Sequence, residues 1–167
     1  SQMYKILIVD DEPANLKLLQ NILEQDYELS FATSGKVALS IARKLEPDMI
    51  LLDVMMPELD GFEVCSRLKA MEHTAKIPVI FVTALNSAED EVHGFEAGGV
   101  DFIKKPISSH LVLTRVATHL ALYNQQKECE RKILERTEEL ENSYLTAISM
   151  LAEAGHYNDT DTGVHVW

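Results

Sequence analysis

Apolar and polar residues follow two different periods along the first two thirds of the chain. Short unbroken apolar runs are typical of strands buried on both faces of a sheet. Between these runs, apolar residues recur every three or four positions, as on one face of a helix. The segment 27–33 instead alternates apolar and polar residues, as a half-exposed strand does. The pattern predicts strands at 5–10, 27–33, 49–52, 77–83 and 100–104, with a helix after each.

The order of these segments predicts the fold class. Strand and helix alternate five times, and alternation of this kind implies right-handed crossovers and a doubly wound parallel sheet. The last helix is capped by Ser108 or Ser109 and is long, because no Gly or Pro occurs between Ser109 and Gly155. We therefore expect an α/β fold with a long C-terminal helix.

Acidic residues follow two of the predicted strands at the point where each strand ends. Asp10 ends the first predicted strand and Asp11 comes directly after it, and Asp53 follows the third. In open parallel sheets, ligands bind just outside the carboxyl ends of the strands. Three close carboxylates repel one another unless a cation joins them, and hard oxygen ligands with room for water suit Mg²⁺. The sequence therefore predicts a magnesium-assisted acidic site.

Asp53 is the candidate nucleophile of this site. A carboxylate can attack phosphorus to form an aspartyl phosphate, and the charge of a phosphoryl group requires cations and donors nearby. Lys105, at the end of the fifth strand, could pair with Asp53 and then with the phosphoryl oxygens, and Thr83, which ends the fourth strand, could donate its hydroxyl to the same oxygens. Simpler roles exist: Asp53 as a turn or capping residue, Thr83 as a helix cap, Lys105 as a solvated lysine. Four strand ends with the right residue types in the right order favour the functional interpretation.

The composition argues against several classes of function. The formal net charge of −12 leaves no basic face for nucleic acid or for an anionic membrane surface. No apolar run approaches the roughly 18 residues of a transmembrane helix, and the N-terminus lacks the pattern of a signal peptide. Cys65 and Cys129 match no metal-binding spacing, so we expect free thiols in a cytoplasmic protein.

Four motifs carry a resemblance to a known family. They occupy residues 9–12 (Val-Asp-Asp-Glu), 52–61 (from Leu-Asp-Val to Leu-Asp-Gly), 82–84 (Val-Thr-Ala) and 98–106 (from Gly-Gly-Val to Lys-Lys-Pro). In order and spacing, residues 4–122 resemble the receiver domain of two-component response regulators. The resemblance implies a flavodoxin-like sheet of five parallel strands in the order 2-1-3-4-5.

The resemblance also implies a role for the acidic residues. By this resemblance, Asp53 is the phospho-acceptor, and a sensor histidine kinase is the phosphoryl donor. Asp10 and Asp11 correspond to the acidic pair that, with Asp53, binds Mg²⁺. The backbone carbonyl of Met55 corresponds to a further metal ligand. The expected cofactor is therefore Mg²⁺.

Further implied roles fall on the ends of the fourth and fifth strands. The functional lysine of the family stands directly before a proline, so Lys105 rather than Lys104 corresponds to it. The resemblance also implies a cis peptide bond between Lys105 and Pro106. Thr83 and Phe102 take the places of the switch residues, although Phe102 could also be an ordinary core phenylalanine. Gly99 departs from the family, in which alanine is commoner at that position.

Two apolar residues stand where the family tunes the loss of phosphate. Met55 and Leu85 cannot hydrogen-bond an attacking water. We therefore expect slow intrinsic dephosphorylation.

The long last helix carries two apolar stripes separated by the polar stretch 124–132, which suggests a linker or hinge. The first stripe fits packing on the receiver sheet, and the second fits the seam of a two-helix coiled coil. We expect a homodimer through the helical segment 123–153; the alternative is a single helix that a further domain covers. The first stripe is Leu113, Val116, Leu120 and Tyr123, and the second is Ile133, Thr137, Leu140, Tyr144, Ile148 and Leu151.

Residues 147–154 and 158–165 resemble the opening of an HD-GYP domain, a metal-dependent phosphodiesterase that hydrolyses cyclic di-GMP. Asp161 and His165 fall where that family has an acidic residue, more often Glu, and a histidine near its metal centre. The defining His-Asp pair and Gly-Tyr-Pro signature are absent. We therefore expect residues 154–167 to be the truncated start of an output domain, without a complete enzyme site.

The leading hypothesis is a receiver that passes a phosphorylation signal through the long helix to a cyclic di-GMP phosphodiesterase. A stand-alone Mg²⁺-dependent phosphatase with Asp53 as nucleophile is the alternative, but that class needs a second aspartate where Met55 stands. A DNA-binding output is disfavoured, because residues 123–167 are acidic and contain no helix-turn-helix pattern.

Overall fold

The computed structural model describes the backbone of residues 2–164 and the side chains of residues 2–156. The chain divides into two units, Ser1–Tyr123 and Asn124–Trp167. The strands are β1 (Lys5–Val9), β2 (Glu28–Ala32), β3 (Met49–Leu52), β4 (Val79–Thr83) and β5 (Asp101–Lys104). The helices are α1 (Pro13–Leu23), α2 (Gly35–Leu45), α3 (Gly61–Ala70), α4 (Ala88–Glu96) and α5 (Ser109–Val164).

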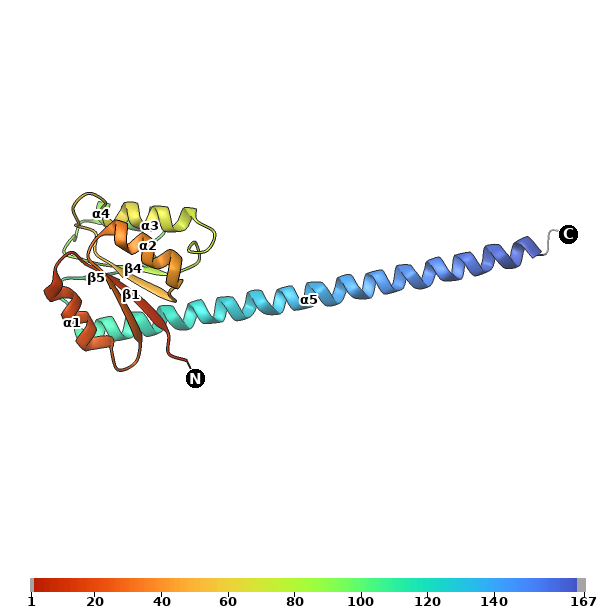
Figure 1. Cartoon of the computed structure of the whole chain (residues 1–167), viewed down its shortest axis with the longest axis horizontal. Coiled ribbons are helices and arrows are strands. Elements are labelled where there is room, and N and C mark those ends of the chain that lie inside the picture. The colour runs from red at the N-terminus through yellow and green to blue at the C-terminus, as the bar shows by residue number, and fades with distance from the viewer. Residues whose placement is uncertain (1, 165–167) are drawn as a thin grey trace. The chain divides into compact units, whose positions relative to one another are not determined.

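The strands form one parallel sheet in the order β2-β1-β3-β4-β5, so the predicted fold class and strand order are confirmed. Figure 1 shows the sheet of the first unit between its helices. Each predicted strand is correct to within two residues. The largest difference is at Pro78, which precedes β4 and has no N–H to donate to the ladder.

Alternate residues of the central strands form two cores, one on each face of the sheet. Ile6 and Ile8 pack with α1 and the first turns of α5, whereas Leu7 and Val9 pack with α2 and α3. Both faces of β1, β3 and β4 are thus buried, which explains their unbroken apolar sequences. β2 lies at an edge of the sheet, and its exposed and half-buried residues explain its alternating pattern.

The first turns of α5 pack on the sheet, but not through all the residues that the sequence predicts. Val112, Val116 and Leu120 are buried, whereas Leu113 is 36% exposed. Val112, Val116 and Leu120 are each four positions apart and therefore lie on one face of the helix, and this face starts at Val112 rather than at Leu113. The prediction of Leu113 as a packing residue is therefore wrong by one position.

The polar stretch 124–132 is helical, as part of α5. Arg131 bonds to Glu128 at 3.1 Å one turn before it and also pairs with Glu135 one turn after it. Such pairs support a helix that lacks tertiary packing. Among residues 2–164, no helix has the length and apolar character needed to cross a membrane. The thiols Cys65 and Cys129 are free, as expected.

Candidate functional site

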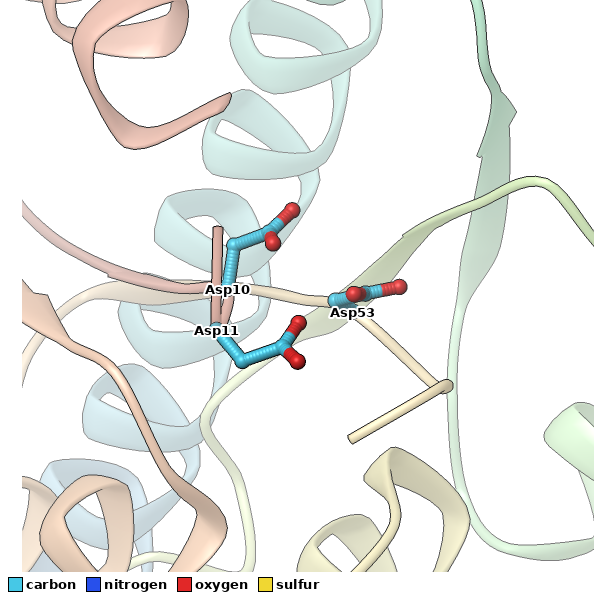
Figure 2. A group of neighbouring side chains, drawn as sticks. All are labelled: Asp10, Asp11 and Asp53. Atoms are coloured by element: carbon cyan, nitrogen blue, oxygen red, sulfur yellow. The ribbon is translucent and has the colours of Figure 1, made fainter. Parts of the chain in front are cut away.

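The acidic residues are brought together by two neighbouring strands. Asp10 and Asp11 follow β1, and Asp53 follows β3, whose Leu52 is the register partner of Val9. The Asp53 N–H donates to the Val9 carbonyl at 2.9 Å, which extends the pairing by one residue. One carboxylate oxygen from each aspartate lies within 4.8 Å of the others, and Figure 2 shows the three side chains at adjacent strand ends.

Burial sets the electrostatics of this cluster. Asp10 is 1% exposed and Asp53 is 5% exposed, whereas Asp11 is exposed. Burial, followed by the charge of Asp10, raises the pKa of Asp53 to about 6, although Lys105 and a backbone hydrogen bond from Met55 oppose this shift. A second positive charge at the site would stabilise the ionised form of Asp53.

Lys105 places a positive charge beside the two buried carboxylates, Asp10 and Asp53. Its Nζ donates to Asp10 at 2.8 Å and lies 3.5 Å from an oxygen of Asp53. The sequence predicts pairing with Asp53, but Asp10 is the closer partner. Burial lowers the pKa of Lys105, but hydrogen bonds and charges from Asp10 and Asp53 outweigh it, so that the pKa is raised. The Lys105-Pro106 peptide bond is cis, as the resemblance predicts.

Thr83 lies at the carboxyl end of β4 and is fully buried. Its hydroxyl oxygen accepts a hydrogen bond from the Leu85 N–H at 3.3 Å. The alternative role as a cap of the next helix is wrong, because Ser87 caps α4 through the Asp90 N–H. The corresponding capping role of Asp53 is also wrong, because Asp60 caps α3.

Phe102 faces the interior on β5 and is 5% exposed. Its ring centroid lies 5.1 Å from that of Phe81 on β4 and 5.5 Å from that of Phe95 on α4. The predicted switch residue is therefore held in an aromatic cluster that joins two strands and a helix.

Two features of the site were not predicted. A Cβ atom on Gly61 would lie 2.2 Å from the Asp53 carbonyl oxygen, so only glycine lets α3 begin this close to Asp53. A hollow of about 540 Å³ lies beside Val54, with Met55, Leu85 and His93 in its lining. The sequence signal for Gly61 is its position after Asp60, where a turn is expected; His93 gives no comparable signal.

Comparison with known proteins identifies the family. The sequence matches the response regulator receiver domain over residues 6–117, so the chain belongs to this family, which functions in two-component signalling. A probable cyclic di-GMP phosphodiesterase of Vibrio cholerae is 42% identical over 96% of this chain. The response regulator PleD of Caulobacter vibrioides is 47% identical over 67% of the chain.

A solved structure gives the same fold. The receiver domain of the sensor histidine kinase PA1611 from Pseudomonas aeruginosa has a TM-score of 0.67 and 26% identity, with 72% of this chain and 99% of that chain covered. That structure holds a magnesium ion in its active-site cleft. Receiver domains typically bind Mg²⁺ at an acidic pocket, and this chain has a cluster of three acidic residues, Asp10, Asp11 and Asp53, at the carboxyl edge of its sheet.

The chain spans 38% of the length of the Vibrio cholerae relative and 25% of the length of PleD. The activity of a longer protein therefore does not follow from the receiver alone.

Proposed function

We propose that Asp53 accepts a phosphoryl group from a sensor histidine kinase in the cytoplasm. The observation that carries the proposal is the juxtaposition of Asp53 with Asp10, Asp11 and Lys105 at the carboxyl edge of the sheet. An oxygen of Asp53 attacks phosphorus, the bond from phosphorus to the imidazole nitrogen of the donor breaks, and that nitrogen keeps the electron pair. The product is an acyl phosphate on Asp53.

The residues of the site fit a divalent cation. Lys105 pairs with the two buried carboxylates, Asp10 and Asp53, while Asp11 adds a third, exposed carboxylate, so these four side chains keep net negative charge and offer hard oxygen ligands. Asp10, Asp11, Asp53 and the Met55 carbonyl would hold Mg²⁺. The bound ion would neutralise charge on the carboxylates and on the phosphoryl oxygens. Lys105 then pairs with a phosphoryl oxygen and orients the group.

The signal passes from the site through Thr83 and Phe102. Thr83 ends β4 at the same edge of the sheet as Asp53, and its hydroxyl can donate to a phosphoryl oxygen. This new bond draws Thr83 toward Asp53 and changes the packing around Phe102. The surface of α4 and β5 changes in turn.

An output domain receives this change through the helical segment 123–153. We propose that the output is a cyclic di-GMP phosphodiesterase of the HD-GYP type, with residues 154–167 at its start. The match to the Vibrio cholerae protein over 96% of this chain supports the proposal, because it extends beyond the receiver. His165 lies outside the described residues, and the side chain of Asp161 is not described.

A second copy of the chain is the proposed partner of the segment 123–153. Ile133, Leu140, Tyr144 and Leu151 are between 58% and 73% exposed. The hydroxyl of Thr137, in the same stripe, donates to the Ile133 carbonyl at 2.9 Å, so its burial leaves no donor unpaired. Two such stripes cover one another in a coiled coil.

Beryllofluoride, a mimic of the phosphoryl group, tests the proposal. We expect the chain to bind it only with Mg²⁺, and we expect Asp53→Ala to abolish binding. Asp11→Asn should weaken Mg²⁺ binding by about tenfold or more, because it replaces a negatively charged carboxylate oxygen with a neutral amide oxygen. Asp26→Asn, the same substitution at an exposed aspartate that precedes β2 at the opposite edge of the sheet, serves as the control and should leave Mg²⁺ binding unchanged. Calorimetric titration measures both affinities.

A further inference from the structure

Gly94 has no conformational reason to be a glycine. It is a buried position inside α4, and its φ angle is not in the left-handed region, unlike that of Gly98. A glycine inside a helix is less stable than an alanine, because it loses more backbone freedom on folding. Packing, rather than backbone geometry, must therefore account for Gly94.

The packing feature is the ring of Phe102. A Cβ atom on residue 94 would lie 2.3 Å from Cζ of Phe102 and 3.0 Å from Cε2 of Phe81. The first distance is far too short for two carbon atoms, whereas the second is a tight contact that a shift of a few tenths of an ångström relieves. The tip of the Phe102 ring thus fills the space that the missing side chain of Gly94 leaves.

Phe102 also shares a face of the sheet with Thr83. Phe81 and Phe102 are register partners on β4 and β5, and register partners point to the same face. Thr83 follows Phe81 by two residues, so it points to that face too. A movement of Thr83 toward a phosphoryl group on Asp53 therefore takes it away from the ring and favours the inward position of Phe102.

We propose that Gly94 is a positioning residue. Because it has no side chain, the Phe102 ring can occupy its inward position, and this position favours the phosphorylated form of the receiver. The inference rests on the function proposed above. A displaced ring has space to enter, because a hollow of about 320 Å³ borders Phe102 between α4, β5 and α5, with Phe95, Leu111 and Arg115 in its lining. A side chain at position 94 would shift the ring toward this hollow.

The test compares Gly94→Ala in two backgrounds. With Phe102 present, Gly94→Ala should weaken the affinity for beryllofluoride and Mg²⁺ by roughly fivefold or more and should lower the melting temperature. With Phe102→Leu, the ring tip is gone and the contact of 3.0 Å with Cε2 of Phe81 remains, so the same substitution should leave the affinity unchanged and should lower the melting temperature less. A crystal structure of Gly94→Ala should show Phe102 turned outward.

Gly99→Ala is the matched control, because its Cβ would lie 2.3 Å from Cε2 of Phe81, and its three nearest atoms belong to Phe81 and Gly94 rather than to Phe102. Its loss of stability should persist in the Phe102→Leu background. Unchanged affinity in Gly94→Ala, or the same weakening in both backgrounds, overturns the inference. If Gly94→Ala does not fold, recovery of folding by Phe102→Leu supports the inference and failure to recover overturns it. A wild-type chain that binds no beryllofluoride refutes the proposed function instead.

Discussion

Lys105 donates a hydrogen bond to Asp10 at 2.8 Å and lies 3.5 Å from Asp53, so one ammonium group joins two buried carboxylates from different strands. Asp10 follows β1 and Asp53 follows β3, while Lys105 follows β5. The lysine therefore spans β4 to reach them, since β4 lies between β3 and β5. This contact holds together the three strand ends that form the site.

Removal of this lysine should destabilise the chain. Lys105→Met leaves Asp10, which is 1% exposed, without its ion-pair partner. We expect a loss of about 2–3 kcal/mol in the free energy of unfolding, because an unpaired buried charge is costly. Urea unfolding at pH 7.5 measures it.

Lys104→Met is the control for this prediction. Lys104 pairs with Glu91 at 3.3 Å on the surface, and exposed pairs contribute only about 0.5 kcal/mol. Equal losses in the two variants would show that the contact with Asp10 does not stabilise the fold.

The free energy of unfolding should fall as the pH rises from 4 to 6, because Asp53 loses its proton over this range. Its pKa is about 6 in the folded chain, above the ordinary value of 3.8, so the folded state binds more protons than the unfolded state in this range. The stabilisation is fully present below pH 4 and is lost as the pH passes 6.

Asp53→Asn removes this dependence. Without Mg²⁺, the variant should be more stable than the wild type by on the order of 2 kcal/mol at pH 7.5, and the difference should vanish toward pH 4. Urea unfolding of both proteins across this range measures the difference. A constant difference at all pH values would contradict the raised pKa of Asp53.

The phosphorylated chain should lose its phosphate slowly. Met55 is 61% exposed and lines the hollow beside the site with Leu85, and neither side chain can orient a water for attack on phosphorus. Met55→Asn combined with Leu85→Gln should accelerate the loss by about tenfold or more, because a polar group can then position that water. The decay of radiolabelled phosphate gives the rate.

A substitution far from the site provides the comparison. Met3 is exposed and precedes β1, at the opposite end of the strand from Asp10. Met3→Asn should leave the rate unchanged. Fast loss in the wild type, with no response to the paired substitutions, would rule out this role of Met55 and Leu85.

The segment 123–153 should dimerise the chain through its apolar stripe. Leu140 lies on the stripe and is 58% exposed. Leu140→Asp places a charge in the seam and should give a monomer, whereas Asn142→Asp, on another face of the helix, should remain dimeric. Sedimentation equilibrium distinguishes the two states. A monomeric wild type would contradict the proposed seam.

The sequence predicts most of the fold because the main signals are local. Unbroken apolar runs specify the central strands, and Asp10 and Asp53 come directly after two of them. Once strands are parallel and adjacent, their ends must meet. The positions of these carboxylates are therefore predictable without knowledge of any side-chain contact.

Other features depend on contacts between distant segments. The preference of Lys105 for Asp10 over Asp53 depends on how a long side chain crosses β4. The match between Gly94 and Phe102 depends on the approach of α4 to β5. Neither relationship has a period or motif along the chain, so neither could be predicted from the sequence.

The most direct test of the account is to find where a phosphoryl group attaches. The chain is incubated with acetyl phosphate and Mg²⁺, and mass spectrometry then locates the added group in its peptides. We predict one phosphoryl group on Asp53, and none in Asp53→Ala or after chelation of Mg²⁺. An unmodified wild type, or an adduct that persists in Asp53→Ala, would contradict the central claim.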